Sequence, residues 1–422
     1  MNMRVLLIVT LVLLTGPASA APVIRPAPGA NPAVRPVPRE APAPPMVFYV
    51  ANGAPDACGR GCDSWIAAEG QIDAAAAPRF RKFLARVRDR NLPIYFSSPG
   101  GNLDQALAMG AMLRERPVVA RVARAVVREC GFEAQNSDAC LKLKQSGREL
   151  HGDLWTRNAT CNSACPYLIL GAARREIAPD ALLAVHSPRV VPHFRGGVPT
   201  AQMRAEATVR GLERADRMLS HYIVKMGAEP GLLTLASSIK YESMHVLTRD
   251  EIVRFGIDRR EFVETSWTFE HVGRSMVHKT VIQKNDGDKS FRLKQWRLLC
   301  FNADQFELGF QRPAVANALF PTVSISNGSP KPFFLSPAPS KPPGVDLWGL
   351  RMTRASVQAL AELPQFDFTE TSQGTDGRRL AHSVKFSGEG LTRALESLLA
   401  TCPASKSITA LQAIRSHDSA AK

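Results

Sequence analysis

The sequence predicts an α/β domain followed by a smaller, β-rich domain. Strand-like and helix-like patterns alternate over residues 65–122 and resume over 163–258, which is typical of a parallel sheet with helical crossovers. After about Val263 the pattern changes to a series of strand-like stretches. A chain of 422 residues with 45% hydrophobic and 22% charged residues is an ordinary globular protein of two or three domains.

The first 20 residues predict a signal peptide. Arg4 supplies a positive charge, residues 5–14 form an apolar run broken only by Thr10, and small residues end at Ala20 in an A-x-A pattern. The apolar run is too short to cross a bilayer as a helix, which takes about 20 residues. We therefore expect a mature chain that begins near Ala21 and is periplasmic or secreted.

The next segments divide the chain further. Residues 21–45 hold nine prolines and predict a stiff, extended and unpacked linker. Structured sequence then divides at about residue 263 into domains 46–263 and 264–403, and a polar tail follows over 404–422. In the first domain the predicted strands are 46–50, 65–72, 93–97 and 118–122, and the predicted helices are 77–90 and 102–113.

The alternation is interrupted over residues 123–160, which are polar. It resumes with a helix from about Ser163, a strand that ends at His186, and helices over 200–226 and 248–255. The second domain is predicted to contain strands over 291–300, 366–371 and 381–386, a proline-rich loop over 329–343 and a helix over 391–399.

Eight cysteines in an exported chain indicate disulfides. Cys300 and Cys402 are the only two in the last third and are predicted to pair with each other. The other six, which fall into close pairs around one region, are Cys58, Cys62, Cys130, Cys140, Cys161 and Cys165. A zinc site is the alternative, although the spacing is not C-x-x-C and no histidine clusters with the cysteines.

The chain is basic, with 53 Lys and Arg against 38 Asp and Glu and a formal net charge of +15. Two readings stay open: a compositional bias toward arginine, or attraction to an anionic envelope surface. We predict no cofactor, no metal and no nucleic-acid partner.

Three segments hold residues suited to acyl transfer. The first, residues 98–101, is a Ser-Pro-Gly-Gly turn after a buried strand, where glycines can present backbone N–H groups. Ser163 opens a helix, where N–H groups are free, and His186 ends a strand, where catalytic groups gather. A serine, a histidine and N–H donors form an acyl-transfer site. Taken singly, each has a structural reading: a turn, a helix cap and a packed histidine.

The segment that ends at His186 carries the most specific pattern. An arginine is followed four residues later by a proline, apolar residues precede the histidine, and a proline comes two residues after it. The residues that fit are Arg175, Pro179, Leu183, Val185, His186 and Pro188, whereas Ala184 and Ser187 depart from it. With Ser163-Ala164 and residues 65–72, 94–101 and 247–257, this pattern resembles the ClpP serine protease family of the ClpP/crotonase superfamily.

The resemblance covers residues 65–122 and 158–258, and it implies a ClpP/crotonase-like domain of repeated ββα-type units. It implies Ser163 as the nucleophile, His186 as the general base, and Gly101 and Ala164 as the donors of the oxyanion hole. Before Ser163, Thr160, Cys161 and Asn162 replace the family's glycine and small residues. A disulfide from Cys161 or Cys165 would clamp this serine turn in place of the lost glycine packing.

The third catalytic residue is the most important departure from the pattern of the ClpP family. Lys240 falls where the family has an aspartate, and a lysine cannot accept the proton of the His ring. Four readings stay open: Glu242 or another carboxylate serves, a Ser–His dyad works alone, catalysis is lost, or Lys240 itself is the base.

The predicted function is an exported serine peptidase or related acyl hydrolase. The alternative is a catalytically inactive envelope binding or scaffold protein of the same fold. The predicted partners are a polypeptide or acyl substrate, an anionic envelope surface and further copies of the chain as a homo-oligomer, without an ATP-driven unfoldase. The second domain resembles small disulfide-clamped periplasmic β-sandwiches.

Overall fold

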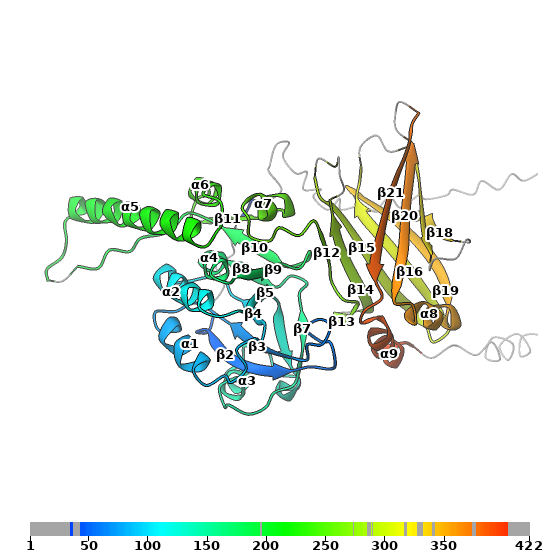
Figure 1. Ribbon diagram of the computed structural model, residues 1–422, viewed down its shortest axis with the longest axis horizontal. Coiled ribbons are helices and arrows are strands. Elements are labelled where there is room, and N and C mark those ends of the chain that lie inside the picture. The colour runs from blue at the N-terminus through cyan, green and yellow to red at the C-terminus, as the bar shows by residue number, and fades with distance from the viewer. Residues whose placement is uncertain are drawn as a thin grey trace, which may run out of the picture.

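A computed structural model describes residues 34–36, 43–194, 196–272, 274–284, 288, 290–315, 319–326, 332–339, 342–373 and 377–403. The predicted signal peptide (1–20) and tail (404–422) lie outside these residues. Figure 1 shows an N-terminal part that mixes helices and strands, beside a C-terminal part built mainly of long strands.

The N-terminal part contains a five-stranded sheet in the order β2-β3-β4-β5-β9. Its strands are β2 (Val47–Asn52), β3 (Ser64–Glu69), β4 (Ile94–Ser97), β5 (Val119–Val122) and β9 (Arg174–Glu176). Strands β3, β4, β5 and β9 pair in parallel, and α1 (Ala76–Leu84) and α2 (Leu103–Arg114) form the crossovers. The parallel arrangement was the one predicted, but α1 ends six residues before the expected position.

A second sheet carries the candidate site and has the order β1-β11-β10-β8. Its strands are β1 (Val34–Pro36), β11 (Ser243–Val246), β10 (Leu182–Val185) and β8 (Thr160–Asn162). The predicted linker 21–45 is therefore not unpacked throughout, because residues 34–36 pair antiparallel with β11. An isolated parallel bridge between Ser98 and Cys161 joins this sheet to the first one.

The polar stretch 123–160 forms a compact insertion. It contains a hairpin of β6 (Arg124–Val127) and β7 (Gly152–Trp155), a short 3-10 helix η1 (Arg128–Cys130), and α3 (Asp138–Lys144). The Lys144 ammonium lies 2.8 Å from the Glu69 carboxylate, and its side chain is almost fully buried. This ion pair attaches α3 to the end of strand β3.

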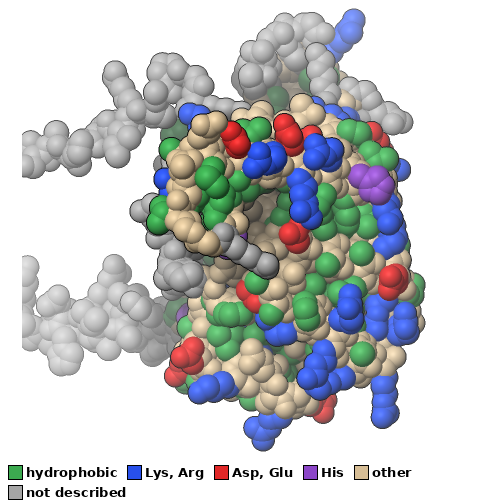
Figure 2. Space-filling view, turned by 90° about the vertical axis from the view of Figure 1, so that its left-hand side faces the viewer, with side chains coloured by type: hydrophobic (Ala, Val, Ile, Leu, Met, Phe, Trp, Pro, Cys, Tyr) green, Lys and Arg blue, Asp and Glu red, His purple; other side chains and the backbone are tan. Residues whose placement is uncertain are grey.

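Four helices surround the second sheet: α4 (Cys165–Leu170), α5 (Ala201–Lys225), α6 (Gly231–Ser238) and α7 (Arg249–Arg254). The C-terminal half of α5 is anchored by Ala215, Leu219, Tyr222 and Ile223, and its first 14 residues are exposed or half-buried. In Figure 1 the N-terminal half of α5 projects away from the body. Figure 2 views the molecule from that side and shows a hollowed face with scattered Lys and Arg side chains and fewer Asp and Glu side chains.

The C-terminal part is one ten-stranded, nearly closed antiparallel sheet in the order β12-β14-β15-β16-β19-β18-β17-β20-β21, with β13 paired to β14. The strands are β12 (Phe262–Glu264), β13 (Thr268–Val272), β14 (Arg274–Gln283), β15 (Arg292–Asn302), β16 (Gln305–Pro313), β17 (Leu319–Ser326), β18 (Phe333–Pro337), β19 (Val345–Thr353), β20 (Gln365–Gln373) and β21 (Arg379–Ser387). The helices are α8 (Arg354–Ala361) and α9 (Leu391–Thr401).

This architecture differs from the expected sandwich because β18 pairs with both β17 and β19 and so joins the two halves into one path. Strand β18 also lies in the segment predicted as a proline-rich loop. Inside the curved sheet, aromatic side chains pack closely: the ring centroids of Trp296 and Phe386 are 4.3 Å apart, and those of Phe310 and Phe368 are 4.5 Å apart.

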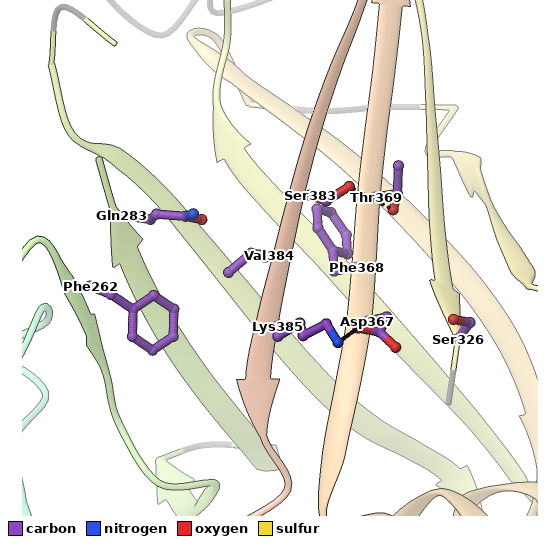
Figure 3. A pocket seen from close by; sticks show the side chains of 9 residues that line it. All are labelled: Phe262, Gln283, Ser326, Asp367, Phe368, Thr369, Ser383, Val384 and Lys385. Atoms are coloured by element: carbon purple, nitrogen blue, oxygen red, sulfur yellow. Dashed lines mark hydrogen bonds and ion pairs between the residues drawn. The ribbon is translucent and has the colours of Figure 1, made fainter. Parts of the chain in front are cut away.

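The two ends of the sheet, β12 and β21, approach each other along a seam. One end of the seam is closed, since the Trp267 N–H donates to the Glu389 carbonyl at 2.8 Å. Further along, the edges leave a pocket of about 540 Å³. Figure 3 shows Phe262 and Gln283 on one side of it and Lys385, paired with Asp367, on the other.

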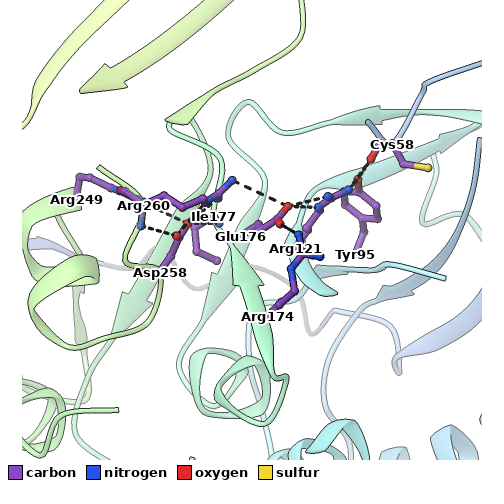
Figure 4. Close-up of polar contacts among 9 residues, drawn as sticks. All are labelled: Cys58, Tyr95, Arg121, Arg174, Glu176, Ile177, Arg249, Asp258 and Arg260. Atoms are coloured by element: carbon purple, nitrogen blue, oxygen red, sulfur yellow. Dashed lines mark hydrogen bonds and ion pairs between the residues drawn. The ribbon is translucent and has the colours of Figure 1, made fainter. Parts of the chain in front are cut away.

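Arginine–carboxylate pairs hold β9 in place next to the site-bearing sheet (Figure 4). The Glu176 carboxylate on β9 accepts from the Arg121 Nε at 2.8 Å. The Asp258 carboxylate accepts from the Ile177 N–H at 2.9 Å and from the Arg249 guanidinium at 3.0 Å. Charge-assisted bonds of this kind are stronger than neutral ones, so they fix the strand that leads into β10.

Four disulfides form: Cys58–Cys62, Cys130–Cys140, Cys161–Cys165 and Cys300–Cys402. The predicted Cys300–Cys402 pair and the close pairing of the other six are confirmed. These bonds are compatible with an oxidising compartment. No helix among the described residues is both long and apolar enough to cross a membrane.

Candidate active site

Ser163 sits in a tight turn between β8 and α4. Its φ is +60°, a left-handed conformation that non-glycine residues rarely adopt. The Ser163 N–H donates to the Ala184 carbonyl on β10 at 2.8 Å. This bond to the neighbouring strand holds the turn in its strained conformation, and strain of this kind is common at functional sites.

The Cys161–Cys165 disulfide spans this turn. Both cysteines are fully buried, one at the centre of β8 and the other at the first position of α4. The predicted clamp from these cysteines is therefore present, and it connects them to each other. The strand before Ser163 and the helix after it cannot move apart while the bond is intact.

His186 follows directly after β10, and its Nε2 lies 2.8 Å from the Ser163 Oγ. Strands β8 and β10 are parallel neighbours, with Leu183 opposite Cys161 and Ala184 opposite Asn162. Because carboxyl ends of parallel strands meet at one edge, the residues just beyond both strands come together there. The two residues predicted as nucleophile and base are thus in hydrogen-bond contact.

Backbone hydrogen bonds join the glycine turn after β4 to β8, next to Ser163. The Ser98 N–H donates to the Thr160 carbonyl at 2.8 Å, and the Asn162 N–H donates to the Ser98 carbonyl at 3.0 Å. Gly100 has a φ of +100°, and a Cβ there would lie 2.5 Å from both the Asn162 carbonyl oxygen and the Ser163 Cβ. Only glycine fits this close approach to the serine turn.

Two backbone N–H groups beside the turn are available to a ligand. Gly101 and Ala164 make no N–H hydrogen bond within the described part of the chain. The bonds from Ile72 N–H to Gly100 O and from Asn102 N–H to Ile72 O turn the Gly101 N–H away from Ile72. A Cβ on Gly100 would lie 3.1 Å from the Ala164 nitrogen, so the glycine turn borders the second donor.

The Nδ1 of His186, on the side of the ring away from Ser163, has no carboxylate partner among the described residues. The buried Nδ1 has no hydrogen-bond partner among the described residues. Lys240 and Glu242, the two residues considered for this role, are both exposed, and neither bonds to the ring. Tyr241 packs against the imidazole instead, edge to face, with ring centroids 5.0 Å apart.

The surroundings of His186 favour its neutral form. Burial lowers the pKa of His186, and the adjacent Ser187 backbone and the negative charge of Glu242 oppose that shift. A neutral imidazole whose Nε2 faces a serine hydroxyl can accept its proton. The arrangement can therefore support a serine nucleophile, a histidine base and an oxyanion site, with no carboxylate to orient the base.

Sequence reasoning singled out the turn 98–101 without assigning roles to Ser98 and Gly100, and it missed Tyr241. Gly100 was visible as half of a Gly-Gly pair, but its close approach to Ser163 depends on the bridge between Ser98 and Cys161. Tyr241 carried no signal, because its contact with His186 is tertiary. No group of three or more His, Cys, Asp or Glu side chains in the described segments is arranged to hold a metal ion.

Comparison with known proteins adds no relative: no protein-family model matches the chain, and no curated protein matches it. The likeness to the ClpP family therefore stays a prediction, carried by the residues around Ser163 and His186.

Proposed function

We propose that this protein is an exported serine peptidase or related acyl hydrolase that works with Ser163 and His186. The proposal rests chiefly on the 2.8 Å contact between the Ser163 Oγ and the His186 Nε2. The strained turn and the two free N–H groups of Gly101 and Ala164 support it further.

In the proposed reaction, the Ser163 Oγ bonds to the substrate acyl carbon as its proton passes to the His186 Nε2. The Gly101 and Ala164 N–H groups stabilise the oxyanion. When the oxyanion collapses, the bond to the leaving group breaks and the leaving group takes the proton from His186. Water then attacks the acyl-enzyme in the same way, which releases the acid and restores Ser163.

The free Nδ1 of His186 predicts a slow enzyme. Replacing the aspartate that orients the histidine of a serine protease by asparagine lowers kcat by about 10⁴. Here Tyr241 and the hydrogen bond to Ser163 orient the ring, and the charge of Glu242 is the acidic influence on its pKa from the described residues. A Ser–His dyad of this kind is suited to activated esters or to low turnover.

The same observation favours a second candidate, a catalytically inactive envelope binding or scaffold protein. A histidine needs no carboxylate partner in order to bind a ligand or to pack within the site. In that case the glycine turn and the serine turn would be kept for the shape of the site.

Hydrolysis of a p-nitrophenyl ester by the purified, oxidised protein tests the proposal. We expect turnover that is lost in Ser163→Ala and in His186→Ala. Ser187→Ala is the matched control, since its side chain makes no hydrogen bond in the described structure and lies one residue from the base. Equal residual rates in the wild type and in both active-site variants would overturn the hydrolase proposal.

A further inference from the structure

A side-chain stack leads from His186 to an exposed cation. The Tyr241 ring contacts the His186 ring edge to face, with an interplanar angle of 68°. The guanidinium carbon of Arg189 lies over the same tyrosine, 5.4 Å from its centroid. Stacking on an aromatic ring leaves the N–H donors of a guanidinium free to bind a planar anion.

The backbone fixes this stack in place. The Ser187 N–H donates to the Ile239 carbonyl at 2.9 Å, which brings the segment after His186 beside the segment that carries Tyr241. Pro188, with its restricted φ, precedes Arg189. On the far side Val190 packs against α5, where a Cβ on Gly211 would lie 2.5 Å from a Val190 methyl group. Arg189 is thus held between two anchored neighbours.

Arg189 has no acidic partner. It is exposed and makes no ion pair or hydrogen bond among the described residues, and the same holds for the exposed Lys240 next to Tyr241. Glu242 is the competing carboxylate nearby, and its charge acts on His186. Two unpaired cations against one carboxylate leave a local positive excess beside the Tyr241 ring that contacts His186.

We propose that Arg189, assisted by Lys240, forms a carboxylate-binding subsite that selects acidic substrates for Ser163. The proposal rests on the hydrolase function and specifies its substrate class: polypeptides or acyl compounds that carry a carboxylate close to the reacting bond. The guanidinium supplies a fork of two donors that fits a carboxylate, and Lys240 adds charge without fixed geometry. The carboxylate has two sources, an acidic side chain or a free C-terminus.

Binding to the Ser163→Ala protein tests the subsite independently of catalysis. The probes are N-acetylated, C-amidated alanine hexapeptides with a single Glu or a single Gln at each position, and an alanine hexapeptide with a free C-terminal carboxylate. We expect at least one Glu peptide, or the free acid, to have a Kd about tenfold lower than its Gln or amide counterpart. The position of the effect distinguishes a side chain from a C-terminus.

Adding Arg189→Gln should abolish this preference and leave the Kd of the Gln peptides unchanged. Arg189→Lys should restore part of it, because the charge returns without the planar fork. Arg210→Gln, which removes an exposed arginine of α5, is the control and should keep the preference. A preference that survives Arg189→Gln, or equal binding of all Glu and Gln peptides, would overturn the subsite.

Failure of the subsite and failure of the hydrolase are distinguishable. Ester hydrolysis that depends on Ser163 but shows no preference for carboxylates would contradict the subsite alone. Tight, Arg189-dependent binding of acidic peptides without any hydrolysis would support the subsite and contradict the enzyme.

Discussion

Asp180 offers the sharpest energetic prediction. It lies two residues before β10, at the opposite end of the strand from His186, and both carboxylate oxygens are shielded from solvent. Burial raises the pKa of Asp180 from 3.8 to about 6, opposed by Thr156 and Arg157 and reinforced by the charge of Glu270 on β13. Arg157 and Glu270 are themselves paired across the two parts of the molecule.

The magnitude follows from the size of the shift. A rise from 3.8 to about 6 is roughly two units, and each unit is 1.36 kcal/mol, so an ionised Asp180 costs the folded state about 3 kcal/mol. Below about pH 4 both states are protonated and the cost is absent. Above about pH 4 the side chain ionises in the unfolded chain but stays protonated in the folded protein. The folded state therefore loses stability until the pH passes the folded pKa of about 6.

Asp180→Asn keeps the shape of the side chain and cannot ionise. Between about pH 4 and pH 7 the free energy of unfolding of the variant, relative to the wild type, should rise by about 3 kcal/mol. Urea unfolding at a series of pH values measures this difference, because the contributions of all other groups cancel. Asp304→Asn, which removes a carboxylate from an exposed turn, is the control. A difference that is flat or falls with pH would refute the reasoning.

Three further predictions concern the site. The rate of ester hydrolysis should rise with pH and reach half its maximum below pH 6.5, because burial lowers the pKa of His186 and keeps the base neutral; a midpoint above 6.5 in a pH–rate profile would contradict this. Tyr241→Leu should lower that rate about two- to tenfold while Tyr241→Phe retains it, because an edge-to-face pair contributes about 0.5–1.5 kcal/mol; equal rates in both variants would remove the positioning role. Replacing Cys161 and Cys165 by serine should cost about 2 kcal/mol of stability, measured by urea unfolding, and also reduce hydrolysis in the fraction that stays folded; unchanged hydrolysis would show that the clamp does not hold the Ser163 turn.

The meeting of Ser163 and His186 was open to prediction from the sequence because it depends on local pattern. Ser163 is predicted at the start of a helix and His186 at the end of a strand in an alternating α/β segment, where catalytic groups gather at one edge of the sheet. The pairing of Cys300 with Cys402 was equally accessible, since they are the only two cysteines in the last third of the chain.

Features that depend on long-range pairing could not be predicted from the sequence. The proline content of residues 21–45 predicts an extended chain, and nothing local shows that residues 34–36 add to β11. Strand β18 lies among prolines that favour a loop, yet its apolar Phe333, Phe334 and Leu335 pair with β17. The Tyr241–His186 contact depends on the hydrogen bond from Ser187 to Ile239, which joins segments about 50 residues apart.

The most direct test of the central claim is labelling of the oxidised protein with a fluorophosphonate probe, followed by mass-spectrometric mapping of the modified peptide. A Ser–His pair in hydrogen-bond contact at 2.8 Å predicts one adduct on Ser163 that is lost in His186→Ala and kept in Ser187→Ala. No adduct on the correctly folded, fully oxidised protein, or an adduct on Ser163 that persists without His186, would contradict the claim that His186 activates Ser163.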